Sequence, residues 1–397
     1  MGHPSCGAWE LHGGHRPRPA LVAFAGNLVK LTAERMGILV RNVLLVALLS
    51  GIVFFLLEGG VRLLAPQQAR MEMLGGESLA VKDSVLGHRL RPGAVAVDHA
   101  IEFTARYAIN EQGLRDDAVY SAHKSEGRTR FLVLGDSFAF GVGSDYKHIW
   151  PVLVEQTLAA RGRSVELVKA GVPAFDTRLE VLYLNQMFAH TTPDAVILTF
   201  LPNDLFTNNP LHGEGEGADL AEQIAVNADD KNQTLHVVTL LQRLLMNSDR
   251  LYSFLYWVTP RRQYFEVPPT AELQSRLATT SNLLREAARF CREQGVPLVV
   301  LSIPQQFQVL VEGRGYRYEG MDMHYIDREL GRLAVQEGFR WISTLDKLSS
   351  TYRENREDLY YRLDGHLNER GNRVVAEYFA DQLDLVVQAW RDTAPIH

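Results

Sequence analysis

Ser137 stands where an apolar stretch gives way to small and polar residues. Residues 131–134 are continuously apolar and are followed by Gly135, which is typical of a central strand in a parallel sheet covered on both faces. Ligands of such sheets bind beyond the carboxyl ends of the strands, and a glycine allows a tight turn there. The sequence therefore presents Asp136 and Ser137 at a ligand-binding edge. Ser137 could be a nucleophile, although an ordinary strand-to-loop turn accounts for the same residues.

Three more polar stretches occupy comparable positions in the chain. "AGVPAFDT" contains Gly171, "FLPNDL" contains Asn203, and "LDGHLNERGN" contains Asp364 and His366. Each stretch alone is compatible with a turn or a cap, because Asn-Asp and Asp-Gly pairs are common in loops. Together they hold the residue types of nucleophilic catalysis. A serine hydroxyl needs a base, and an imidazole base needs an acceptor that fixes its tautomer.

In order and spacing, these four stretches resemble the SGNH, or GDSL, hydrolase superfamily. The resemblance implies a three-layer, flavodoxin-like α/β sandwich with a parallel sheet, and catalysis without a cofactor. It implies that Ser137 is the nucleophile, His366 the base, and Asp364 the residue that orients the base. It also implies an oxyanion hole formed by the N–H groups of Ser137 and Gly171 and the side chain of Asn203.

Two features depart from the family pattern. Leu201 stands where the third block usually has glycine, and the last block is Asp-x-His instead of Asp-x-x-His. The shorter spacing is similar to that of the alginate O-acetyltransferase branch, whose members modify exopolysaccharide in the cell envelope. Three functions remain open: a serine esterase acting on O-acyl, chiefly acetyl, esters of an extracytoplasmic carbohydrate or lipid; an O-acetyltransferase modifying an envelope polysaccharide; and a catalytically silent, polymer-binding envelope protein. Both enzymes would use one acyl-enzyme intermediate, so sequence motifs do not separate them.

A second Asp-x-His pair, Asp322 and His324 in "GMDMHYID", competes for the role of base. We expect Asp364 and His366 to hold it, because they directly precede a long amphipathic helix that can fix the imidazole. Asp322 and His324 follow "EGRGYRYEG", which predicts a mobile loop suited to substrate contact or to no function.

Strands alternating with amphipathic helices predict the parallel sheet over residues 128–392. Strands are expected at 131–134, 165–168, 195–200, 297–303 and, at an edge, near 339–342. Helices are expected at 150–160, 177–188, 271–293, 325–336 and 369–390. An insertion spans 205–270. Its part 212–223 predicts a polar loop, and its later part predicts helix whose apolar face packs on the main domain or covers the site.

The N-terminal region predicts a membrane anchor. Residues 38–57 contain one charge, Arg41, and a helix of that length spans about 30 Å, the thickness of a bilayer core. Basic residues before the span predict a cytoplasmic N-terminus and an extracytoplasmic, periplasmic catalytic domain. We expect residues 1–36 to be disordered, with Met36 an alternative start of translation, residues 37–64 to form the anchor, and residues 83–127 to form a small β-rich appendage with strands at 85–117.

Composition excludes several other functions. The 397-residue chain has a net charge of -6 and its basic residues form no stripe, which argues against nucleic-acid binding. Its two cysteines, Cys6 and Cys291, lie far apart, and the histidines lack the spacing of a zinc site, so no metal is expected. "GVGSDY" lacks the third glycine of a dinucleotide fingerprint, and no glycine-rich loop carries a P-loop lysine. Composition does not specify the acyl group, the acceptor or the oligomeric state.

Overall fold

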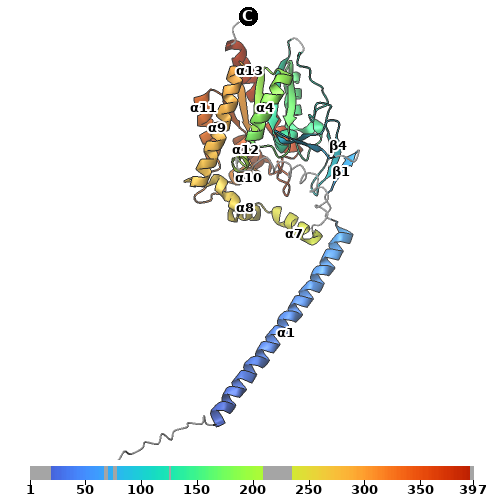
Figure 1. The fold of residues 1–397 in the computed structure, drawn as a ribbon, viewed down its shortest axis with the longest axis vertical. Coiled ribbons are helices and arrows are strands. Elements are labelled where there is room, and N and C mark those ends of the chain that lie inside the picture. The colour runs from blue at the N-terminus through green and yellow to red at the C-terminus, as the bar shows by residue number, and fades with distance from the viewer. Residues whose placement is uncertain (1–18, 67–69, 75–77, 125–126, 209–234, 394–397) are drawn as a thin grey trace, which may run out of the picture. The chain divides into compact units, whose positions relative to one another are not determined.

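The computed structural model describes residues 19–66, 70–74, 78–124, 127–208 and 235–393, and the chain forms two compact units, Met1–Pro66 and Gln67–His397 (Figure 1). The described residues of the first unit form one helix, α1 (Pro19–Leu64). Among the described residues, its part Arg35–Leu64 is the one helix long and apolar enough to cross a membrane, with a mean hydropathy of 2.4. Residues 19–36, predicted to be disordered, are part of α1. The alanines and leucines of this segment favour helix.

Five parallel strands form the central sheet of the second unit. In chain order they are β6 (Thr129–Gly135), β7 (Val165–Gly171), β8 (Ala195–Phe200), β9 (Leu298–Ser302) and β10 (Arg340–Ser343). Their order across the sheet is β10-β9-β8-β6-β7. Every residue of the first four strands is buried, as their continuous apolar runs predict, and β10 lies at an edge. The five predicted strands are confirmed.

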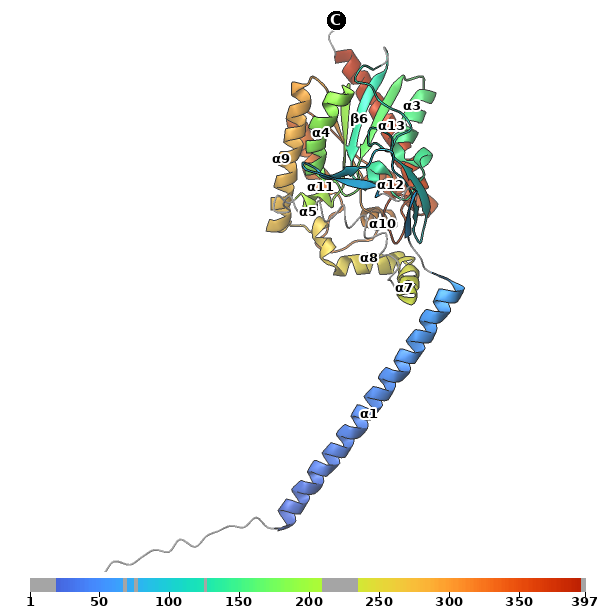
Figure 2. The same cartoon turned by 45° about the vertical axis from the view of Figure 1, so that its right-hand side comes forward.

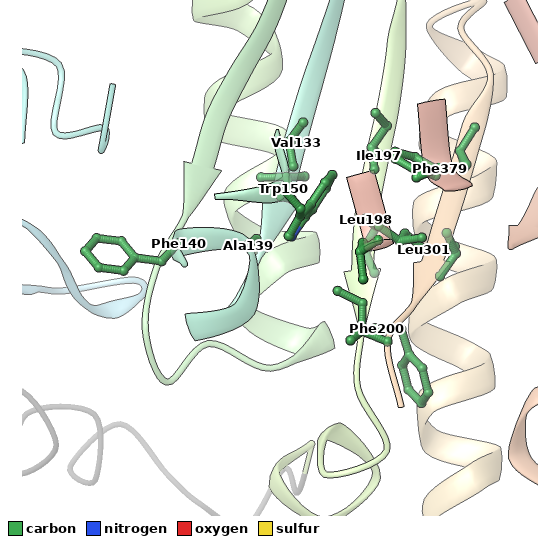
Figure 3. Close-up of a cluster of buried hydrophobic side chains, with 14 of the residues drawn as sticks. Val133, Ala139, Phe140, Trp150, Ile197, Leu198, Phe200, Leu301 and Phe379 are labelled. Atoms are coloured by element: carbon green, nitrogen blue, oxygen red, sulfur yellow. The ribbon is translucent and has the colours of Figure 1, made fainter. Parts of the chain in front are cut away.

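Helices cover both faces of this sheet (Figure 2), so the unit is the predicted three-layer α/β sandwich. One face carries α3 (Trp150–Ala160) and α13 (Glu369–Thr393), and the other carries α4 (Thr177–Thr191) and α9 (Ala271–Glu293). Trp150 of α3 and Phe379 of α13 lie edge to face, 5.7 Å between ring centroids, against Val133 of β6 and Ile197 of β8 (Figure 3). The strand that leads to Ser137 is therefore held inside the core.

The remaining helices of this unit include the predicted α11 (Tyr325–Glu337) and two that the sequence did not predict, α10 (Gln306–Arg314) and α12 (Leu345–Asn355). α10 is buried almost all round, including Gln308, whose side chain donates to the Met323 carbonyl oxygen at 2.8 Å. A helix without a solvent face has no amphipathic period, which explains why its pattern was not recognised. The stretch "EGRGYRYEG" is accordingly not all loop, because its first three residues end α10.

The predicted β appendage lies before β6. Its strands are β1 (Arg70–Leu74), β2 (Ala80–Asp83), β3 (Gly87–Leu90), β4 (Val95–His99) and β5 (Thr104–Ala108). β1, β4 and β5 form an antiparallel sheet, and β2 pairs with β3 in a hairpin. The strands were expected over residues 85–117. They begin earlier, at Arg70, and end earlier, at Ala108.

The insertion forms α7 (His236–Met246), α8 (Asp249–Val258) and a 3-10 helix, η3 (Pro260–Phe265). The predicted polar loop at 212–223 lies outside the described residues. The helical part was expected to pack its apolar face on the main domain or to cover the site. Packing on the domain is wrong for α7, where Leu241 and Leu244 are 55% and 61% exposed. Its buried side chains are instead the polar His236 and Thr239. In α8, Tyr256 does pack, stacking on Phe307 with 3.9 Å between ring centroids.

Candidate active site

The turn after β6 presents Ser137 as the first residue of a four-residue helix, α2 (Ser137–Phe140). Asp136 caps this helix, because its buried carboxylate accepts a hydrogen bond from the Phe138 N–H at 2.8 Å. Gly135 cannot be replaced without a shift, since a Cβ there would lie 2.5 Å from the Ala139 Cβ. The strand and the helix therefore meet too closely for any other residue at this point.

His366 lies between Ser137 and Asp364. Its Nε2 is 2.7 Å from the Ser137 Oγ, and its Nδ1 is 2.5 Å from the Asp364 Oδ1. The imidazole also packs at 4.9 Å between centroids against the ring of Phe138. The side chains of His366 and Asp364 are 21% and 27% exposed, so the three groups are accessible from solvent. The structure thus brings together three of the residues selected from the sequence.

The loop that carries Asp364 and His366 is closed by its own backbone. The Gly365 N–H donates to the Tyr361 carbonyl oxygen, and the Tyr361 N–H donates to the His366 carbonyl oxygen, each at 2.9 Å. Gly365 has a φ of +87°, a backbone conformation that residues other than glycine rarely adopt. α13 begins three residues after His366 and fixes the end of the loop.

Gly171 and Asn203 end up at the same edge of the sheet as Ser137. Gly171 is the last residue of β7 and pairs with Gly135. A Cβ at Gly171 would lie 2.4 Å from the Phe140 backbone nitrogen, so glycine is required where α2 crosses the strand end. Asn203 follows β8, a neighbour of β6, and precedes α5 (Asp204–Thr207). Its side chain does not cap that helix, which leaves the amide available for another role.

The competing pair, Asp322 and His324, has other partners. The Asp322 carboxylate accepts from the His324 N–H at 2.9 Å and pairs with Arg328 at 2.5 Å, which holds the pKa of Asp322 below its usual range. The imidazole Nε2 of His324 lies 3.9 Å from the Asp346 carboxylate. Asp322 and His324 therefore belong to the structure at the start of α11. The imidazole within hydrogen-bond distance of Ser137 is that of His366.

Buried carboxyl groups lie around the turn that carries Ser137. Burial raises the pKa of Asp136 to about 6, and it raises the pKa values of Glu180 and Asp204 well above their usual range. Asp204 accepts a hydrogen bond from the Thr177 hydroxyl at 3.0 Å, whereas neither oxygen of Glu180 has a partner among the described residues. A buried carboxylate without hydrogen-bond partners is disfavoured, which is why the pKa of Glu180 lies above its usual range.

Arg115 holds the other end of α2, a role that the sequence did not predict. Its guanidinium is 1% exposed and donates to the carbonyl oxygens of Phe140 and Gly141 at 2.8 Å and of Ser144 at 2.6 Å. The same group lies 4.7 Å from the ring centroid of Tyr107. No local pattern marks it, because three of the four carbonyl groups that it binds lie at least 25 residues away in the chain, and the fourth, of Arg106, lies nine residues away.

A cavity of about 450 Å³ borders the Asp364 loop. Its walls come from the turn between β4 and β5, from the insertion and from residues 362–365. Polar side chains of the insertion line it, among them Gln242, Tyr252 and Arg261. Its volume suits a ligand the size of a small oligosaccharide or a cofactor.

The parallel sandwich, with a serine, a histidine and an aspartate hydrogen-bonded in series at the carboxyl edge of its sheet, is the architecture of the SGNH hydrolases. The sequence model of the GDSL-like Lipase/Acylhydrolase family matches residues 133–374, and the chain belongs to that family. The resemblance noted from the sequence motifs is thereby confirmed at the level of the superfamily.

Similar solved structures include an acetyl xylan esterase, AlAXEase, with 13% identity and a TM-score of 0.39, and TesA, with 16% identity and a TM-score of 0.38. A third is a putative arylesterase from Agrobacterium tumefaciens str. C58, with 17% identity and a TM-score of 0.36. In each case the similarity covers 64% of this chain and 98% of the other. Comparison with curated proteins finds no match.

Proposed function

We propose that this protein is a serine esterase that cleaves O-acyl, chiefly acetyl, esters of a carbohydrate or lipid through an acyl-enzyme intermediate. The observation that carries the proposal is the position of His366, within hydrogen-bond distance of both Ser137 and Asp364. A base at 2.7 Å from a serine hydroxyl can accept its proton as the hydroxyl attacks. Asp364 then stabilises the imidazolium and fixes its tautomer.

The steps follow from this geometry. The Ser137 Oγ attacks the ester carbonyl carbon while His366 takes the hydroxyl proton. The oxyanion accepts hydrogen bonds from the N–H groups of Ser137 and Gly171 and from the Asn203 amide, each worth roughly 3 to 4 kcal/mol of barrier. His366 then gives its proton to the leaving alkoxide, which departs as an alcohol and leaves acyl-Ser137. Water, activated by His366, attacks this ester and releases the acid.

The lining of the cavity beside Asp364 supports a hydroxyl-rich substrate. Gln242, Tyr252 and Arg261 offer an amide, a phenol and a guanidinium, which suit the hydroxyl groups of a sugar better than a long acyl chain. The acyl group itself would then be short, as in an acetyl ester.

The proposed location is the outer face of a membrane. Support comes from the length and hydropathy of Arg35–Leu64 and from Arg16, Arg18, Lys30, Arg35 and Arg41, which precede or begin the apolar segment. A reporter fused after His397 should behave as extracytoplasmic. A cytoplasmic reporter, or a secreted product that begins near residue 60, contradicts the anchor.

The proposal is tested with the full chain in detergent. Wild type should hydrolyse p-nitrophenyl acetate and be labelled by a fluorophosphonate, and Ser137→Ala should lose both without a change in thermal stability. Ser275→Ala, a change at an exposed position of α9, is the matched control and should behave as wild type. A folded wild type that neither turns over nor takes the label would favour a silent polymer-binding protein.

The O-acetyltransferase alternative rests on the Asp-x-His spacing of Asp364 and His366. The same acyl-Ser137 would then pass its acetyl group to a sugar hydroxyl instead of water. Product analysis with an acetyl donor and added oligosaccharides separates the two reactions. Acetylated sugar as the main product indicates the transferase, and free acetate indicates the esterase.

A further inference from the structure

Glu102 lies in the turn between β4 and β5, outside the residues that match the family, yet it contacts the loop that carries Asp364. Its Oε1 accepts a hydrogen bond from the Arg362 N–H at 2.8 Å. Its Oε2 accepts from the N–H groups of Leu363 at 2.8 Å and Asp364 at 3.0 Å. Three successive backbone N–H groups therefore converge on one carboxylate.

Hydrogen bonds from N–H groups to an ionised carboxylate are roughly twice as strong as neutral ones, and a concave run of N–H groups is a favourable anion site. One of these three groups belongs to Asp364 itself, two residues before His366. The carboxylate thus fixes the backbone from which the Asp364 side chain reaches His366.

The bonds within the loop do not supply this constraint. The two bonds between Tyr361 and residues 365 and 366 set the shape of the turn, but they join the loop only to itself. Glu102 is what ties residues 362–364 to the appendage. Placement of the turn relative to Ser137 is a separate requirement from its shape, since proton transfer needs about 2.6 to 3.2 Å between base and hydroxyl.

Neighbouring contacts extend the same connection toward the nucleophile. The ring of Phe103 packs on that of Tyr361 with 4.8 Å between centroids. The Tyr361 hydroxyl donates to the Gly143 carbonyl oxygen at 2.9 Å, and the Gly143 N–H donates to the Tyr107 oxygen at 3.0 Å. The appendage, the turn after α2 and the Asp364 loop therefore form one packed assembly.

We propose that Glu102 is a positioning residue of the catalytic site, which holds Asp364, and through it His366, at the distance that Ser137 requires. The β appendage then contributes to the geometry of the site through Glu102. This inference rests on the proposed hydrolytic function, because it assigns Glu102 a role through the proposed base.

The test compares Glu102→Gln and Glu102→Ala with Glu111→Gln in the full chain. Glu111 is an exposed acid shortly after β5 and provides the matched control. With p-nitrophenyl acetate, Glu102→Ala should lower kcat about 100-fold, the effect of a displacement near 1 Å, with KM changed less than twofold. Glu102→Gln should lose less than Glu102→Ala, because its amide oxygen can still accept hydrogen bonds from the N–H groups of Leu363 and Asp364.

The pH profile separates positioning from a merely structural role. A displaced Asp364 no longer stabilises the imidazolium, so the acid limb of the kcat profile should move to lower pH in the Glu102 variants. Fluorophosphonate titration should show an unchanged number of active sites. Wild-type kcat and pH profile in both variants would overturn the proposal. So would a loss of activity matched by a loss of titratable sites, because Glu102 would then serve folding alone.

A direct readout keeps this test independent of turnover. The proton on the His366 Nδ1, bonded to Asp364, should give a downfield NMR resonance that is absent from His366→Ala. Glu102→Ala should weaken or shift that resonance, and Glu111→Gln should leave it in place. If the wild type is inactive but shows this response, the esterase proposal fails while the positioning role stands. An unchanged resonance in Glu102→Ala refutes the positioning role.

Discussion

Replacing Gly171 by alanine tests whether the crossing of β7 and α2 sets the geometry of the nucleophile. The added Cβ would lie 2.4 Å from the Phe140 nitrogen and 2.6 Å from the Ala139 carbonyl carbon. Both are backbone atoms of α2, so no side-chain rotation can relieve the overlap. Ordinary contacts lie at 3.4 to 4 Å. The helix must therefore move by roughly 1 Å relative to the strand.

The size of the effect follows from that movement. Ser137 belongs to the same four-residue helix, and its Oγ is 2.7 Å from the His366 Nε2. A shift of about 1 Å takes this pair beyond the hydrogen-bond range and should lower kcat about 100-fold. The cost in the free energy of unfolding should be about 1 to 3 kcal/mol, the usual range for overpacking.

The assay measures p-nitrophenyl acetate turnover, the rate of fluorophosphonate labelling and thermal unfolding. Gly331→Ala is the matched control, because its Cβ would meet Trp341 at an ordinary 3.8 Å, within α11. It should keep wild-type turnover and gain about 0.5 to 1 kcal/mol from the lower backbone entropy of the unfolded chain. Wild-type kcat and labelling rate in Gly171→Ala would refute the steric reasoning.

Three further predictions concern the base, the cap and the buried guanidinium. His366→Ala should lower kcat by about 10⁴-fold and His324→Ala by less than twofold in steady-state assays; the reverse result would assign the base to the other pair. Burial raises the pKa of Asp136 from 3.8 to about 6, so its contribution to stability is complete below pH 4 and is lost as the pH rises through 6. In the wild type, the free energy of unfolding measured with urea should fall by up to about 3 kcal/mol between pH 4 and 7 because of Asp136. Asp136→Asn keeps the oxygen that caps α2 and should remove this fall; the same dependence of the free energy of unfolding on pH in the variant would contradict the prediction. Arg115→Met should cost at least about 3 kcal/mol, measured by the same method, because three buried carbonyl groups lose their donor; a neutral change would contradict the buried network.

The central sheet could be predicted because its physical cause is local. Each buried strand is a continuous apolar run, and residues 131–134 show it most clearly. Ser137 and His366 were selected by the resemblance to the SGNH hydrolases, supported by their places after a strand and before a long helix, and the structure brings their side chains together. α10 was missed because it has no solvent face, and the orientation of α7 was missed because its buried side is polar.

Glu102 could not have been found in this way. It sits in an ordinary turn, "HAIEFT", and the N–H groups that it accepts from lie 260 to 262 residues further along the chain. Arg115 is similar, because its partners are backbone carbonyl groups, which carry no mark in a sequence. Positions whose role depends on long-range backbone contacts become visible only when the fold is known.

Glu102 and Arg115 lie before residue 133, outside the region that matches the family, and this affects which part of the chain is needed for activity. A gene fragment that encodes only the matched region would carry the serine, the histidine and the aspartate, but neither of the two charged side chains that hold their loops. We expect such a fragment, joined to a different N-terminal sequence, to be a poor enzyme. A homologue screen that scores only the three catalytic residue types would rank it as active, so the strands upstream should be included in the comparison.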